Sequence, residues 1–125
     1  MAAVVNLTER NTGVVRKITW AWTSHTDGKV AKTTSGAKTA KAYNGEIVRL
    51  VTIPDGTDTP TAAYDVFVYE EAGADALMGG GADRSATATE QVGPANLGVV
   101  AGDKMTLYVE NAGDSKKGVV HLYIR

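Results

Sequence analysis

A two-residue period that recurs in short segments is the feature that most constrains this chain. Residues 14–22, VVRKITWAW, place Ile18, Trp20 and Trp22 on one face and Lys17 on the opposite face. A period of two over nine residues is typical of a β-strand that buries one face. We therefore expect a strand here, with both tryptophans in the core. No segment has a helical period of comparable length, and turn-forming residues recur at the short spacing of all-β domains.

The composition agrees with that pattern. The chain has 15 Val and 15 Thr, which favour pleated strands, and 14 Gly, which favour tight turns. Its 125 residues suit one domain, and 43% hydrophobic residues suffice for a core. The sequence predicts a single all-β domain over 1–125, a compact antiparallel β-sandwich or barrel (jelly-roll-like) of about eight short strands. Residues 1–12 are expected to form an N-terminal edge strand or an arm that reaches a neighbour.

Two dipeptides predict hairpin turns, because Asp-Gly and Asn-Gly supply the positive φ that two-residue turns need. Pro54 ends the strongest strand, and a polar loop follows it. The expected hairpins pair 14–26 with 29–34 around Asp27–Gly28, and 38–43 with 46–53 around Asn44–Gly45. Further strands are expected at 62–70, 97–102, 104–111 and 119–125, with a Gly/Ala loop at 71–84.

Several function classes are disfavoured by what the sequence contains. It has no cysteine and two distant histidines, His25 and His121, and its acidic loops match no calcium-loop spacing. We expect no catalytic, cofactor-binding or metal-binding residues, and His121 is expected to be partly buried or paired across strands. The formal net charge of −1 and the absence of a long apolar run favour neither nucleic acid nor membrane as a partner. No secretory signal is visible at the N-terminus.

Apolar residues on both faces of two strands point to a covered outer surface. Residues 46–53 show this pattern, and in 62–70 Phe67 and Tyr69 alternate with valines. A neighbouring subunit is one natural cover, so we expect a homo-oligomer, a dimer or a trimer. The candidate interface residues are Val4, Val5, Leu7, Phe67 and Tyr69.

The charge is uneven along the chain. Residues 1–50 hold eight basic and three acidic residues, a charge of +5, and residues 51–125 hold five basic and eleven acidic residues, a charge of −6. Either the two halves mix in one sandwich and the asymmetry averages out, or the subunit is dipolar and attracts its neighbours.

Three stretches resemble a family of small proteins encoded in tailed-bacteriophage genomes. In the first, a Gly-Glu-Ile strand at residue 45 leads through a Pro/Thr loop to Tyr64-Asp65-Val66, and a glycine-rich turn ends at Asp83-Arg84-Ser85. The other stretches are WAWTSHTDGKV at 20–30 and the ending that contains MTLYVENAG (105–113) and GVVHLYIR (118–125). Met105 departs from the leucine of the family pattern. The resemblance covers most of the chain.

The resemblance implies a phage origin and a role in the virion, and it carries over no catalytic motif. We expect a structural protein, foremost a capsid decoration (cement) protein whose partner is the major capsid protein. Its expected location is the outer capsid surface, after synthesis in the bacterial host cytoplasm. A head–tail or tail accessory protein is the alternative, and a carbohydrate-binding module for host adsorption is the alternative of another class.

Overall fold

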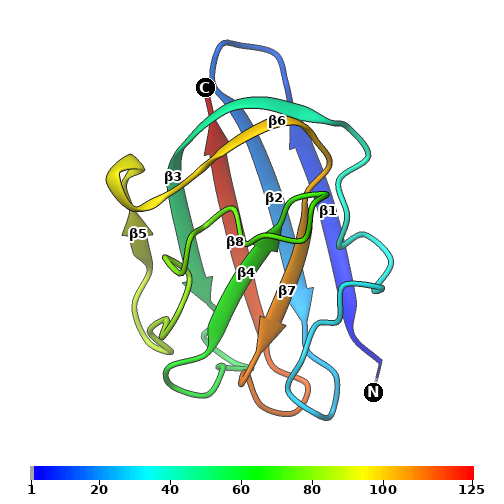
Figure 1. The fold of residues 1–125 in the computed structure, drawn as a ribbon. Coiled ribbons are helices and arrows are strands. Elements are labelled where there is room, and N and C mark those ends of the chain that lie inside the picture. Colours follow the sequence, from blue (N-terminus) through cyan, green and yellow to red (C-terminus); the bar gives the residue numbers. More distant parts are fainter. Residues whose placement is uncertain (1) are drawn as a thin grey trace.

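The computed structural model describes residues 2–125, which form eight strands and one short helix (Figure 1). The helix is the 3₁₀ turn η1 (Pro94–Asn96), and no helix in the described range is long and apolar enough to cross a membrane. The strands are β1 (Val4–Arg10), β2 (Arg16–Thr23), β3 (Tyr43–Pro54), β4 (Asp65–Tyr69), β5 (Glu90–Val92), β6 (Val99–Asp103), β7 (Thr106–Glu110) and β8 (Lys117–Ile124).

The strands form two antiparallel sheets, which confirms the all-β prediction. The large sheet has the order β1-β2-β8-β3-β5, and β6 also pairs with β3; the small sheet is β4-β7. In Figure 1 the small sheet lies in front of the large one, and neither sheet closes on itself. The arrangement is therefore sandwich-like, and the barrel alternative is wrong.

The core lies between the two sheets and follows from the alternation along each strand. Ile18, Trp20 and Trp22 of β2 are at most 2% exposed, as the two-residue period predicts. The indole Nε1 of Trp20 donates a hydrogen bond to the Ala37 carbonyl at 2.9 Å. The facing small sheet contributes Val66, Val68, Leu107 and Val109 to the same cluster, and the neighbouring strand β8 contributes Val120, Leu122 and Ile124.

Both edges of the small sheet are covered by irregular segments. On the β7 side, Val30 bridges Val109 and Lys38 bridges Thr106. On the β4 side, the loop 71–84 bridges Tyr69 through Asp75. Covered edges expose few unpaired backbone groups, so the small sheet offers little edge for another strand to pair with.

The hairpin predicted around Asp27–Gly28 is wrong, although a turn does form there. Gly28 has a φ of +83° and its N–H donates to the His25 carbonyl. However, β2 pairs with β1 on one side and β8 on the other. Both of its edges are occupied, so the chain after the turn crosses to the small sheet and bridges it at Val30.

The hairpin predicted around Asn44–Gly45 is also wrong, because both residues lie inside β3. The register of β3 against β6 shifts between Tyr43 and Asn44, which marks a bulge. Gly45 has a φ of +135°, and a Cβ there would lie 2.5 Å from the Arg125 carbonyl oxygen. Glycine therefore permits a close approach of two strands here, and not a chain reversal.

Other boundaries agree more closely with the predictions. β3 ends at Pro54, and β8 extends to Ile124, with Arg125 paired to Glu46 through two backbone hydrogen bonds of 2.9 Å. β1 lies at the edge of the large sheet, paired with β2 along its whole length. The predicted strand at 62–70 forms over the shorter range of β4, with Tyr64, Val66 and Val68 buried on one side.

Candidate interaction surfaces

Three aromatic rings gather on the outer face of the small sheet, where they form what we call the aromatic patch: Phe67, Tyr69 and Tyr108. The Phe67 and Tyr69 rings are nearly parallel, at 11°, with centroids 5.8 Å apart. Tyr108 pairs with Phe67 in the β4–β7 register and tilts against both rings at 5.7 and 6.1 Å. All three side chains are half-buried, although no strand or helix within residues 2–125 pairs over this face.

The sequence predicted Phe67 and Tyr69 as interface residues but missed Tyr108. Tyr108 alternates with Leu107 and Val109, which are buried, so its period places it on the outer face. Its partners across the sheet could be known only from the register of β4 with β7.

Contacts within the chain already occupy part of the ring surface of the aromatic patch. A sugar needs an open ring face, whereas near-parallel rings at this spacing overlap in an offset stack. The Nζ of Lys32 also lies 4.2 Å from the centroid of Tyr69, a cation–π contact that occupies ring surface. Trp20 and Trp22 are buried in the core and present no ring face at the surface. Less ring surface is therefore open to a ligand than three isolated rings would offer.

Burial and nearby acidic groups raise the pKa values of the two tyrosines in the aromatic patch. Burial raises the pKa of Tyr69, and the charges of Asp75 and Glu110 raise it further. The pKa of Tyr108 is raised by burial and by the hydrogen bond that its hydroxyl donates to Oε2 of Glu110 at 3.1 Å. Acidic groups therefore lie close to both tyrosine hydroxyls, while the Lys32 ammonium lies over the Tyr69 ring.

The opposite face of the molecule has a different character. On the outer side of the large sheet, Lys17 and Arg49 both lie next to Tyr123 in the strand register. Lys17 Nζ is 5.5 Å and Arg49 Cζ is 5.1 Å from the ring centroid of Tyr123. Arg10 pairs with Lys17 at the edge of the sheet. We call Arg10, Lys17, Arg49 and Tyr123 the cationic face.

The cations of this face have no carboxylate partner within the described residues. The ion pairs of residues 2–125 lie elsewhere and join His25 to Asp27, Arg84 to Glu90, and Lys117 to Asp58. Arg49 instead donates from Nε to the side-chain oxygen of Gln91 at 2.9 Å. Positive charge that is not neutralised within its own chain attracts an acidic surface.

His121 lies beside the cationic face, half-buried and paired across strands as expected. Its Nδ1 is 2.8 Å from the Thr19 hydroxyl. Burial lowers the pKa of His121 below its usual value, and the charges of Lys17 and Arg49 lower it further. The ring is therefore neutral at pH 7.

This shift predicts a loss of stability in acid. The unfolded chain binds the His121 proton near the ordinary pKa of 6.5, and the folded chain binds it only at a lower pH. The stabilisation is complete above pH 6.5 and declines as the pH falls towards the folded-state pKa. Urea unfolding at pH 7.5 and 5.5 measures it, and His121→Gln should lose less stability than the wild type between those values. An equal loss in both proteins would contradict the prediction.

The N-terminal interface candidates do not join Phe67 and Tyr69, because β1 belongs to the other sheet. Val4 is 43% exposed, on the outer side of β1. Val5 is 7% exposed and packs in the core, and Leu7 is partly buried against it. Val5 is therefore not available as a surface contact, since the register with Trp22 turns it inward.

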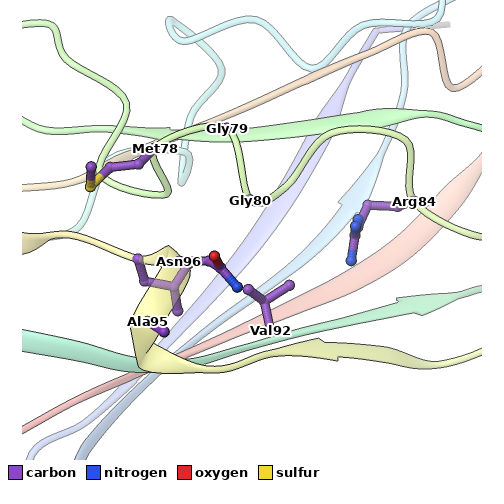
Figure 2. A pocket seen from close by; sticks show the side chains of 8 residues that line it. Met78, Gly79, Gly80, Arg84, Val92, Ala95 and Asn96 are labelled. Carbon is purple, nitrogen blue, oxygen red and sulfur yellow. The ribbon is translucent and has the colours of Figure 1, made fainter.

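A hollow of about 530 Å³ lies beside η1 (Figure 2). Figure 2 shows Met78 and Arg84 at its two ends, with Val92 and Asn96 between them below the Gly79–Gly80 segment. Arg84 is the charged residue of the lining, and its Nη1 lies 3.6 Å from Oε1 of Glu90. Among the described residues, no three His, Cys, Asp or Glu side chains come together as metal ligands would. Comparison with protein-family models, curated proteins and solved structures found no match to this chain.

Proposed function

We propose that this chain is a structural protein of a tailed-bacteriophage virion, a capsid decoration protein that binds the assembled head and stabilises it. The observation that carries the proposal is the presence of two contact surfaces on opposite faces of one small sandwich. One such surface can bind the shell while the opposite one stays free for a further contact. The phage-like stretches around Tyr64-Asp65-Val66 and at 105–113 support the same role.

The cationic face is the surface that we assign to the capsid. Lys17 and Arg49 both lie over the Tyr123 ring on the outer side of the large sheet, and within residues 2–125 no acidic group forms an ion pair with them. An acidic patch of the major capsid protein would complete these charges and direct the approach of the subunit. Many such contacts on one shell favour the assembled state by mass action, because binding to that state alone stabilises it.

Particles of the phage that carries this gene provide the test. Quantitative mass spectrometry of purified virions should find tens to hundreds of copies per particle, as a symmetric shell requires. Particles from a deletion strain should lose DNA at a lower temperature than wild-type particles. About a dozen copies would instead favour the head–tail alternative, which has that lower symmetry. Absence from the virion would reject both.

Charge reversal on the cationic face tests its assignment. Deletion particles incubated with recombinant Lys17→Glu/Arg49→Glu protein should bind less of it than of the wild type, and wild-type binding should weaken as salt rises. Lys41→Glu is the matched control, because Lys41 is exposed on a loop outside both surfaces. Equal binding of the double variant and the control would remove the cationic face from the proposal.

A further inference from the structure

Three polar side chains in the core lack a hydrogen-bond partner within residues 2–125. The atoms are the indole Nε1 of Trp22, Oγ1 of Thr52 and the hydroxyl oxygen of Tyr64. Each of these residues is at most 2% exposed. A buried polar group without a partner costs free energy, and nearly all such groups in folded proteins bond to protein or to ordered water. Three of them in one small core need a common explanation.

The three side chains are neighbours. The rings of Trp22 and Tyr64 are in contact, with centroids 5.7 Å apart. A Cβ at Gly118 would lie 3.1 Å from Nε1 of Trp22, so the indole nitrogen lies over this glycine. Gly118 is opposite Pro54 in the β3–β8 register, and Thr52 comes two residues before Pro54 on the same face of β3. The indole nitrogen and the Thr52 side chain therefore occupy adjacent positions on the inner face of the large sheet.

Tyr64 reaches this place from the segment that leads into the small sheet, since it directly precedes β4. Burial raises the pKa of Tyr64 to about 12, and the Thr52 hydroxyl partly offsets that rise as a close neighbour. The Tyr64 hydroxyl therefore keeps its proton at pH 7 and lies near Thr52. The two hydroxyls nevertheless form no hydrogen bond with each other.

The donor and acceptor types of the three groups match one water molecule. The indole N–H can only donate, whereas each hydroxyl can both donate and accept. A water oxygen can accept from the indole of Trp22 and from the hydroxyl of Tyr64, while the water donates to Oγ1 of Thr52. Buried waters typically make about three such bonds to groups that otherwise have no partner.

We propose that one buried water molecule binds between Trp22, Thr52 and Tyr64 and joins the two layers of the sandwich. Trp22 of β2 and Thr52 of β3 belong to the large sheet, whereas Tyr64 leads into the small one. The site lies in the core, away from the cationic face and the aromatic patch. It does not depend on the capsid role and is tested on the isolated protein.

A crystal structure of the full chain at high resolution tests the site directly. The expected result is a water with hydrogen bonds of roughly 2.7–3.2 Å to the three atoms. The indole of Trp20 is the control within the same protein, because its N–H donates to the Ala37 carbonyl and should have no water beside it. A direct bond between Thr52 and Tyr64, with no water at Nε1 of Trp22, would overturn the proposal.

Thr52→Val tests the energetic role of the water, because valine has the shape of threonine without its hydroxyl. With the water bound, the variant loses one of its bonds, and the melting temperature should fall by about 3 °C or more. Removal of a hydroxyl that has no partner should instead raise the melting temperature, and a rise would contradict the proposal. Thr8→Val is the matched control, exposed on β1, and should change the melting temperature little.

Tyr64→Phe removes a second ligand of the same water. Because either variant disrupts one shared site, the double variant Thr52→Val/Tyr64→Phe should lower the melting temperature by clearly less than the sum of the two single losses. Circular dichroism melts measure all four proteins. Additive losses would show that the two hydroxyls have separate partners and would reject the shared water.

Discussion

Trp20→Ala is expected to lower the free energy of unfolding by about 3–5 kcal/mol, the usual cost of truncating a buried aromatic side chain. Trp20 is fully buried, and in the strand register it lies between Leu7 of β1 and Val120 of β8. Truncation would leave a cavity between the sheets and would leave the Ala37 carbonyl without its indole donor. A domain of this size has a total stability of roughly 5–15 kcal/mol, so the loss would be a large fraction of it.

Urea unfolding followed by circular dichroism measures this loss, with an m-value close to that of the wild type if the reaction remains two-state. Val99→Ala is the control, because Val99 is 71% exposed and its truncation should change stability by less than about 0.5 kcal/mol. A folded Trp20→Ala protein with wild-type stability would mean that the tryptophan is not a core residue.

The prediction of β2 from the sequence succeeded because its period is a local property. In a strand, alternate side chains point to opposite faces whatever the partner strands are. Ile18, Trp20 and Trp22 therefore had to share a face, and the largest apolar face had to be the buried one. The same reasoning placed Val66 and Val68 correctly.

The hairpin predictions failed because strand pairing is not a local property. Asp27–Gly28 and Asn44–Gly45 both permit positive φ, but the first serves a turn that changes sheets and the second a close approach of β3 to the Arg125 carbonyl. The deciding element is β8, the last strand, which lies between β2 and β3 and occupies an edge of each. A dipeptide signals backbone freedom and does not specify which segments meet.

The two surfaces were visible from the sequence only in part. The excess of positive charge in residues 1–50 contains Arg10, Lys17 and Arg49, but their gathering around Tyr123 depends on β3 and β2 both pairing with β8. The two halves of the chain do not map onto two faces, because Lys32 and Lys38 of the first half lie at the aromatic patch. Charged residues are therefore unevenly distributed within the small-sheet face as well as between the two faces.

Gly118→Ala is expected to destabilise the fold by about 1–3 kcal/mol, the usual cost of an added methyl group in a packed core. Gly118 is opposite Trp22 in the β2–β8 register. A Cβ at Gly118 would lie 2.5 Å from Cζ2 and 2.8 Å from Cε2 of the Trp22 indole. The indole has little room to move, because it is 2% exposed and packs against the Tyr64 ring with centroids 5.7 Å apart.

Two further variants make this prediction specific: a control at another glycine, Gly56, and a second substitution at Trp22. Gly56→Ala introduces the same methyl group where no heavy atom lies within 4 Å, and it should leave stability unchanged or raise it slightly by restricting the unfolded chain. In a Trp22→Phe background, the smaller ring makes room for the methyl group, so Gly118→Ala should cost less than in the wild type. Urea unfolding of the four proteins in this cycle gives the coupling energy. A coupling near zero would show that the clash with Trp22 is not the reason why glycine is needed at position 118.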